Sequence, residues 1–221
     1  MIPKTFRTAK EGALINYSFS DIAVGFGVIN MEAYATTSSG AVVTKAITSN
    51  TVTYPGDPKF TPSTGDAVVG YTKIGEVSFD NSPNNYLTKI SGIGLVDVSW
   101  NIDRTGVTTA IGYIIAKIQV VNSGGTVVST AGSVQSREQT ITAPGFGTTT
   151  TEQLQIDCTS TNIIPGNSLR LTIEMWGKVP SGIGNSIIKI AHTPANVDTD
   201  NFTAATNHTY LKWQVPFKID L

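Results

Sequence analysis

The segment Leu211-Lys-Trp-Gln-Val-Pro-Phe-Lys-Ile-Asp-Leu221 decides the fold class of this chain. Its apolar residues occupy every second position and alternate with polar residues or proline. Successive side chains of a β-strand point to opposite sides, so this alternation places all the apolar side chains on one face. We therefore expect a strand with one buried face, and we expect Leu221 to belong to the core.

The same period of two recurs along the chain between turn residues, and no long segment has the period of a helix. The predicted strands lie at residues 15–19, 26–35, 41–48, 68–79, 87–100, 107–121, 134–142, 152–158, 169–176, 186–191 and 211–221. Residues 53–66 contain three prolines. Because proline cannot donate a hydrogen bond to a sheet, we expect an exposed loop there, and a second loop at residues 143–151.

The longest apolar run, at residues 107–121, is the one segment where a helix is conceivable. β-Branched residues dominate it, and it ends in Asn122-Ser-Gly-Gly125, which is a hairpin signal. We therefore predict a strand that is at least partly buried on both faces.

Length and strand pattern together favour an all-β jelly-roll sandwich of about eight to ten antiparallel strands. A chain of 221 residues suits one large β domain. An immunoglobulin-like domain is shorter, at about 100 residues, and a propeller shows a blade repeat that this sequence lacks. We predict an N-terminal arm at residues 1–12 and a single jelly-roll domain at residues 13–221.

Composition excludes several classes of partner. Charged residues make up 14% of the chain and the net charge is −1, so there is no basic surface for nucleic acid. No apolar stretch approaches the ~18 residues of a membrane span. Residues 1–12 lack the apolar segment and cleavage site of a signal peptide, so we expect none. The single cysteine, Cys158, lies on the apolar side of an alternating run, and we expect it to be a buried small hydrophobe.

The residues that carry chemistry form no recognisable motif. Only two histidines occur, and His192 with Asp198 and Asp200 lacks the ligand spacing of a zinc or calcium site. No G-x-S-x-G segment marks a nucleophile. Carboxylates that might form a glycosidase pair are found instead on the polar sides of predicted strands, namely Glu32, Glu76 and Glu174. We predict no catalytic residue, no metal and no cofactor, and we predict that the chain is not an enzyme.

Two groups of residues are candidates for contacts with other molecules. Trp176, on the face opposite Leu171 and Ile173, is either exposed or part of a second contact surface, and further aromatics lie in or beside predicted loops. The candidate contact aromatics are Tyr54, Phe60, Phe146, Trp176 and Phe202. The N-terminal arm is too short for its own core, so it either pairs with a neighbouring subunit or is a frayed terminus. Its interface candidates are Ile2, Lys4, Phe6, Arg7 and Lys10.

The whole chain resembles the small jelly-roll virion proteins of tailed bacteriophages, of the capsid decoration, cement or head-fibre type. The resemblance lies in the low charge, the near absence of cysteine and the strands rich in Thr, Gly and Asn. Leu169-Arg-Leu-Thr-Ile-Glu-Met-Trp176 and the ending at residues 215–221 share this style. Such proteins commonly assemble as trimers on a capsid lattice, so the resemblance implies a homotrimer.

The function that this resemblance implies is mechanical. The chain would be made in a host cytoplasm, reside in the virion and bind a major capsid protein or another virion protein. Two alternatives stay open: a glycan- or receptor-binding module on a virion or tail, and a capsid protein built from a single jelly roll. A hydrolase ranks last among the hypotheses.

Overall fold

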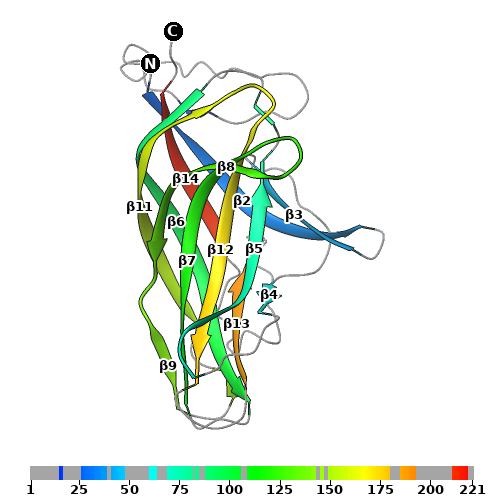
Figure 1. The fold of residues 1–221 in the computed structure, drawn as a ribbon, viewed down its shortest axis with the longest axis vertical. Coiled ribbons are helices and arrows are strands. Elements are labelled where there is room, and N and C mark those ends of the chain that lie inside the picture. The colour runs from blue at the N-terminus through cyan, green and yellow to red at the C-terminus, as the bar shows by residue number, and fades with distance from the viewer. Residues whose placement is uncertain are drawn as a thin grey trace.

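The computed structural model describes residues 15–16, 26–38, 41–47, 60–63, 69–81, 83–84, 88–105, 109–142, 145–146, 149–179, 185–192 and 211–218. Every regular element among them is a strand (Figure 1). The strands before residue 110 are β1 (Ile15–Asn16), β2 (Phe26–Ser38), β3 (Ala41–Ile47), β4 (Phe60–Pro62), β5 (Thr72–Asp80) and β6 (Thr88–Thr105). The later ones are β7 (Ala110–Val121), β8 (Val127–Gln135), β9 (Gln139–Ile141), β10 (Gly145–Phe146), β11 (Thr150–Ile163), β12 (Ser168–Lys178), β13 (Asn185–Ala191) and β14 (Leu211–Lys218). The described residues contain no helix long and apolar enough to cross a membrane.

The eight main strands pair in a nested order. β7 pairs with β8, β6 with β11, β5 with β12, and β2 with β14, and each of these pairs is antiparallel. The chain therefore behaves as one long antiparallel ribbon that is rolled up on itself. The result is a first sheet in the order β2–β14–β6–β11 and a second sheet in the order β5–β12–β7–β8. Two four-stranded sheets with this winding are a jelly roll, which confirms the predicted fold class.

Short strands extend the two sheets and correct the predicted loops. β4 (Phe60–Pro62) lies inside the predicted loop at residues 53–66 and pairs with β13. β10 (Gly145–Phe146) lies inside the other predicted loop and pairs with the end of β6, which runs on to Thr105. Pro62 is tolerated because β4 is the last strand on its side of the sheet, where one edge needs no donor.

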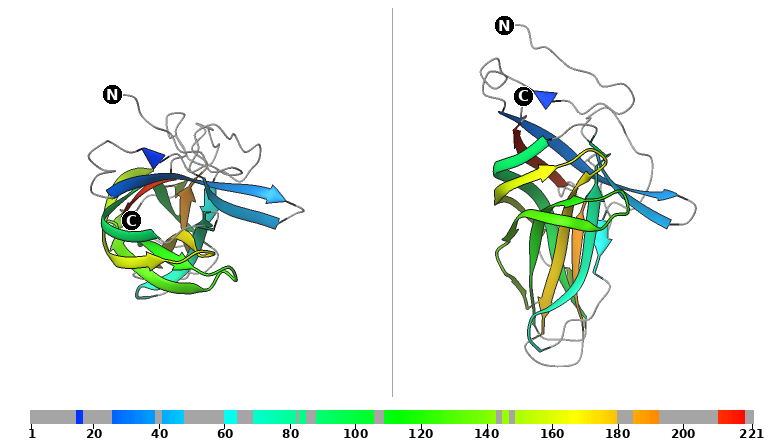
Figure 2. Two further views of the ribbon diagram at one scale, coloured as in Figure 1. Left: turned by 90° about the horizontal axis from the view of Figure 1, so that it is seen from above. Right: turned by 45° about the horizontal axis from the view of Figure 1, so that its top comes forward.

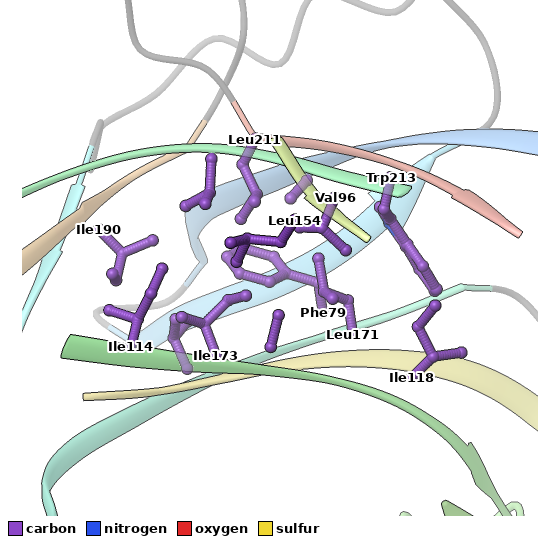
Figure 3. Close-up of a cluster of buried hydrophobic side chains, with 14 of the residues drawn as sticks. Phe79, Val96, Ile114, Ile118, Leu154, Leu171, Ile173, Ile190, Leu211 and Trp213 are labelled. Carbon is purple, nitrogen blue, oxygen red and sulfur yellow. The ribbon is translucent and has the colours of Figure 1, made fainter. Parts of the chain in front are cut away.

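The core lies between the two sheets. Figure 3 shows Leu211, Trp213 and Val96 of the first sheet facing side chains of the second. The facing residues are Phe79, Ile114, Ile118, Leu171 and Ile173. All of these side chains are buried, and each large one contributes about 1.5–3 kcal/mol to the hydrophobic free energy of folding.

The alternation in the last strand is confirmed. Leu211, Trp213, Val215 and Phe217 are buried, whereas the residues between them lie on the outer face. Leu221 lies outside the described residues, so its expected place in the core stays a prediction. The expectation for 107–121 is also confirmed, because in β7 buried residues alternate with half-buried ones on the outer side.

The two sheets approach each other at both sides of the sandwich, so the molecule has a rounded outline when it is seen from above (Figure 2, left). At one side a single parallel bridge joins Lys45 of β3 to Asp80 of β5. At the other side the Thr159 hydroxyl of β11 donates a hydrogen bond of 2.9 Å to the Ala131 carbonyl of β8. There Gly132 is required, because a Cβ atom at this position would lie 2.6 Å from the Asp157 carbonyl oxygen.

The β2–β3 hairpin leaves this body. β2 pairs with β14 from Phe26 to Glu32, and from Glu32 to Ser38 it pairs with β3 instead. Figures 1 and 2 show the far end of the hairpin extending away from the two sheets. The first half of β2 is therefore part of the sandwich, and the second half belongs to a two-stranded projection.

Two reactive side chains are buried. Cys158 is buried in β11 as predicted, and its burial raises the pKa of the thiol. His192 follows β13, and its ring meets Phe79 edge to face with 5.6 Å between the ring centroids. Burial lowers the pKa of His192 from 6.5 to about 3. The folded protein therefore holds this imidazole in its neutral form.

We predict that His192 makes folding sensitive to acid. Between pH 6.5 and about 3 the unfolded chain binds a proton at this position that the folded chain does not bind. The free energy of unfolding therefore falls as pH decreases through this window, by on the order of a few kcal/mol. His192→Gln should reduce the difference between urea unfolding free energies measured near pH 7 and near pH 4. His208→Gln is the control for the second histidine, and an unchanged difference in H192Q would contradict the prediction.

Candidate interaction surfaces

The outer face of the second sheet carries a network of charged side chains. β12 lies between β5 and β7, and its alternate residues point away from the core. Those outer residues are Arg170, Thr172, Glu174, Trp176 and Lys178. Near one end of the strand, Arg170 binds both carboxylate oxygens of Asp80 on β5, at 2.5 and 2.7 Å. The network therefore ties neighbouring strands together across the outside of the sheet.

Glu174 is the central group of this network. Its Oε1 atom accepts hydrogen bonds from Lys117 Nζ at 2.7 Å and Lys73 Nζ at 3.4 Å. Its Oε2 atom accepts one from Trp176 Nε1 at 3.1 Å. Burial on its own would raise the pKa of Glu174, but the hydrogen bonds and the two lysine charges outweigh burial, and the pKa is lowered. Glu174 is therefore held as a carboxylate and fixes the position of the indole.

An aromatic cluster adjoins the charged network. It consists of Tyr71, Tyr113, Trp176 and Lys178, from the residues before β5 and from strands β7 and β12. The Tyr113 and Trp176 rings are nearly parallel, with 6.2 Å between centroids, and Tyr71 lies 4.9 Å from Tyr113. The Lys178 ammonium lies 4.1 Å from the centroid of the Tyr71 ring. Half-buried aromatic rings beside charged hydrogen-bonding groups are suited to bind a sugar or a protein partner.

Burial and nearby carboxylates also act on the tyrosines. Burial raises the pKa of both Tyr71 and Tyr113, and the negative charge of Glu138 raises both further. Both phenols therefore stay neutral at physiological pH. A neutral phenol offers a hydroxyl group that is able to donate or accept a hydrogen bond.

The outer face of the first sheet has a different character. A row of directly paired residues crosses it, formed by Asn30, Gln214, Leu95 and Gln155. Val28 and Ile93 flank this row with 41% and 55% of their surface exposed. We call Val28, Asn30, Ile93, Leu95, Gln155 and Gln214 the neutral face. The ion pair between Lys212 and Glu32, at 2.7 Å, lies at one end of it beside Asp97. At the other end, the exposed Asp157 of β11 is paired with Ile93.

The structure places only part of the residues that the sequence singled out. Trp176 lies half-buried on the outer face of β12, opposite the core residues, as expected. Glu32, Glu76 and Glu174 lie in strands, and each pairs with a lysine. Phe60 and Phe146 lie in β4 and β10 and not in loops. The other predicted contact and cation-site residues lie outside the described residues, namely Ile2, Lys4, Phe6, Arg7, Lys10, Tyr54, Asp198, Asp200 and Phe202.

Sequence reasoning missed Tyr71 and Tyr113. Tyr113 lies in the apolar run of β7, where period-two alternation puts it on the outer side with Ile115 and Lys117. That alternation was a usable signal. The sequence does not predict that Tyr113 lies opposite Trp176, because this pairing depends on the register between two strands that are far apart in the chain. Within the described part of the chain, no three His, Cys, Asp or Glu residues are grouped as metal ligands.

Comparison with known proteins finds similar folds only at low identity. No protein-family model matches the chain, and no curated protein matches it. An α-amino acid ester hydrolase shares 11% identity over 65% of this chain, with a TM-score of 0.41. A CocE/NonD family hydrolase from Staphylococcus aureus shares 9% identity over 84% of the chain, with a TM-score of 0.38. The VP2 subviral particle of infectious bursal disease virus shares 11% identity over 98% of the chain, with a TM-score of 0.26.

These neighbours correct one prediction. We predicted from the sequence that the chain is not an enzyme, and this exclusion is wrong, because the structural neighbours include hydrolases. The chain spans 25% of the length of the ester hydrolase and 41% of the length of the Staphylococcus aureus hydrolase and of VP2. The similarity is one of fold, and it assigns no activity and no residue role to this chain.

We predict that Glu174 stabilises the outer network far more than Glu76 does. Glu174→Gln removes the acceptor charge between two lysines at a mostly buried position, so we expect a loss of about 1–3 kcal/mol in the free energy of unfolding. Because the pKa of Glu174 is lowered, its contribution is present above the unfolded pKa near 4.5 and is lost as pH falls through the folded pKa.

Glu76→Gln is the matched control. Its ion pair with Lys73 joins side chains that are 52% and 40% exposed, so its loss should cost at most about 1 kcal/mol. Urea unfolding of both variants near pH 7 measures the difference. Equal losses in the two variants would show that Glu174 is not the central group.

Proposed function

We propose that the chain is a structural protein of a virus particle, which binds a capsid shell as a decoration or cement protein. The neutral face carries this proposal. Burying charged groups in an interface costs desolvation free energy, and the four residues of the central row, Asn30, Gln214, Leu95 and Gln155, carry no charge. Val28 and Ile93 add exposed apolar surface beside amide side chains, which is the mixture found in the centres of protein interfaces.

The proposed work is mechanical. A stable attachment requires an interface of about 1,000 Å² or more. A protein that binds across the junction between shell subunits adds this contact to the contacts that internal pressure has to break. A jelly roll whose two sheets share one buried core is suited to this load, because pulling one sheet away would expose that core. The partner in this proposal is a major capsid protein or another virion protein.

The N-terminal arm and the trimeric state belong to the same proposal. Residues 1–12 would reach a neighbouring subunit through Ile2 and Phe6, with Lys4, Arg7 and Lys10 facing acidic groups. A homotrimer would present three neutral faces at once, and several weak contacts on one rigid assembly bind more tightly than one.

We predict that the protein is found on virus particles from the culture that produces it, and that the neutral face holds it there. Ile93→Lys replaces an exposed apolar side chain beside the central row by a charge, so it should abolish attachment of purified protein to particles stripped of it. Val128→Lys is the matched control, because Val128 is 59% exposed on β8 of the other sheet. Mass spectrometry and electron microscopy of the particles measure attachment.

Several results would decide against this function. Particles that lack the protein overturn it. Equal attachment of I93K and V128K overturns the role of the neutral face. Assembly of the purified chain alone into closed shells favours a capsid protein built from a single jelly roll instead.

The aromatic cluster favours a second candidate, a glycan- or receptor-binding module on a virion or tail. Trp176 is fixed by its hydrogen bond to Glu174 and lies parallel to Tyr113. Fixed aromatic rings next to the charged groups of Lys178 and Glu174 are the combination that sugar rings require, because their C–H faces stack and their hydroxyls form hydrogen bonds.

For this second candidate we predict binding on a glycan array that depends on Trp176. Trp176→Ala removes the stacking surface and should weaken binding about tenfold or more, which corresponds to about 1.4 kcal/mol. Trp176→Phe keeps an aromatic face and should retain part of the affinity. An array without any bound glycan, or equal binding by W176A and the unmodified protein, would contradict the candidate.

A further inference from the structure

A lysine and an asparagine lie directly opposite each other at a buried position between β6 and β13. The two strands are antiparallel, and their register places Lys189 opposite Asn101. The neighbours of this pair along each strand point into the core, namely Trp100, Ile102, Ile188 and Ile190. Successive side chains of a strand alternate between faces, so Lys189 and Asn101 share the other face. The pair is shielded from solvent there as well, because Lys189 is 8% exposed and Asn101 is 0% exposed.

The side chain of Asn101 is held without the hydrogen bonds that a buried amide normally makes. Its Oδ1 and Nδ2 atoms are both buried, and neither has a hydrogen-bond partner among the described residues. A buried amide that is unpaired at both atoms costs free energy of folding, and it is an exception among native proteins. A reaction at the amide carbon accounts for this exception, because it removes the NH2 group that would otherwise require acceptors.

Lys189 has the surroundings of a nucleophilic amine. Only the neutral form of an amine is a nucleophile, and burial lowers the pKa of the Lys189 side chain. The negative charge of Asp103 opposes this shift but does not cancel it. Directly opposite residues of antiparallel strands have Cβ atoms about 4.5–5.5 Å apart, a separation that the four-carbon stem of a lysine spans. The Nζ atom of Lys189 is therefore within reach of the Asn101 amide carbon.

Asp103 supplies a third group for this chemistry. It follows Asn101 by two residues in β6, so the two side chains lie on the same face. Its charge acts on Lys189, and its Oδ1 atom accepts a hydrogen bond of 2.6 Å from the Arg104 backbone N–H. A carboxylate beside an amine and an amide is suited to take a proton from the first and deliver it to the second.

We propose that Lys189 and Asn101 react with each other in the folded protein and form an intramolecular amide bond between β13 and β6. The Nζ atom of Lys189 attacks Cγ of Asn101, the bond from Nζ to Cγ forms, the bond from Cγ to Nδ2 breaks, and ammonia leaves. Asp103 takes one proton from the attacking amine and passes it to the departing Nδ2. The reaction exchanges one amide for another, so it requires no oxidant and no cofactor. Folding drives it, because the strand register holds the two groups together.

The bond does not depend on the proposed function, and its consequence for the fold is mechanical. β13 lies between β6 and the short strand β4, and its pairing with β6 extends from Asn185 to Ala191. A covalent link in the middle of this pairing keeps the two strands together even when their backbone hydrogen bonds open.

Intact-protein mass spectrometry of the full chain, denatured after purification, tests the inference. We expect the measured mass to be lower than the mass of the sequence by one ammonia molecule. A measured mass equal to that of the sequence overturns the inference, and this result does not depend on any variant.

Peptide mapping locates the bond. Trypsin cleaves after lysine and arginine, so Asn101 lies in the peptide of residues 90–104. An acylated Lys189 is not cleaved, so it lies in the peptide of residues 179–212. We expect these two peptides to be recovered as one branched species. Loss of ammonia within a single unbranched peptide indicates cyclisation of an asparagine on its own backbone, and it would overturn the inference.

Three variants assign the roles of the residues. Lys189→Arg keeps the positive charge but removes the amine nucleophile, so it should have the full mass of its sequence. Asp103→Asn keeps both reacting groups, so it should form the bond slowly and give a mixture of the two masses. Lys178→Arg is the matched control on another strand and should show the same loss of ammonia as the unmodified protein. A mass deficit that persists in K189R overturns the inference, and circular dichroism checks that each variant is folded.

Discussion

The position of β14 between β2 and β6 is the constraint on which the rest of the structure depends. β14 pairs with both strands: Lys212 is opposite Glu32 of β2, and Leu211 is opposite Val98 of β6. The buried residues of β14 pack against the second sheet. Loss of β14 would therefore both split the first sheet and expose the core. The pairing of β2 with β14 is also the outermost of the nested pairs. The inner pairs β5–β12, β6–β11 and β7–β8 are enclosed by it.

The two outer faces of the sandwich divide the polar groups between them. On the second sheet, the charged groups satisfy one another around Glu174, and the aromatic cluster packs against them. On the first sheet, amide and apolar side chains lie in the middle, and the charged pair Lys212–Glu32 lies at one end. A chain with 14% charged residues cannot cover both faces with charge.

The candidate surfaces were predictable only where a single strand carries the information. The alternation within residues 169–176 predicts that Trp176 lies on the outer face of its strand, and the structure confirms this. The contacts of Trp176 with Tyr113 and Glu174 depend on the register between β12 and β7 and on side-chain geometry. Phe60 and Phe146 were assigned to loops because proline and glycine surround them. Their short strands form because β13 and β6 already present unpaired edges there.

The sequence by itself determined the fold class, because period-two alternation depends only on neighbouring residues and on the pleat of a strand. For the same reason, the sequence determined that the side chains of Leu211, Trp213 and Val215 lie on the buried face of their strand. Only the tertiary structure decided which strands are neighbours, that Glu174 lies between two lysines, and that the β2–β3 hairpin leaves the body. Each of these depends on pairing between residues distant in the chain. Such pairing is selected by the packing of the whole core and not by any local pattern.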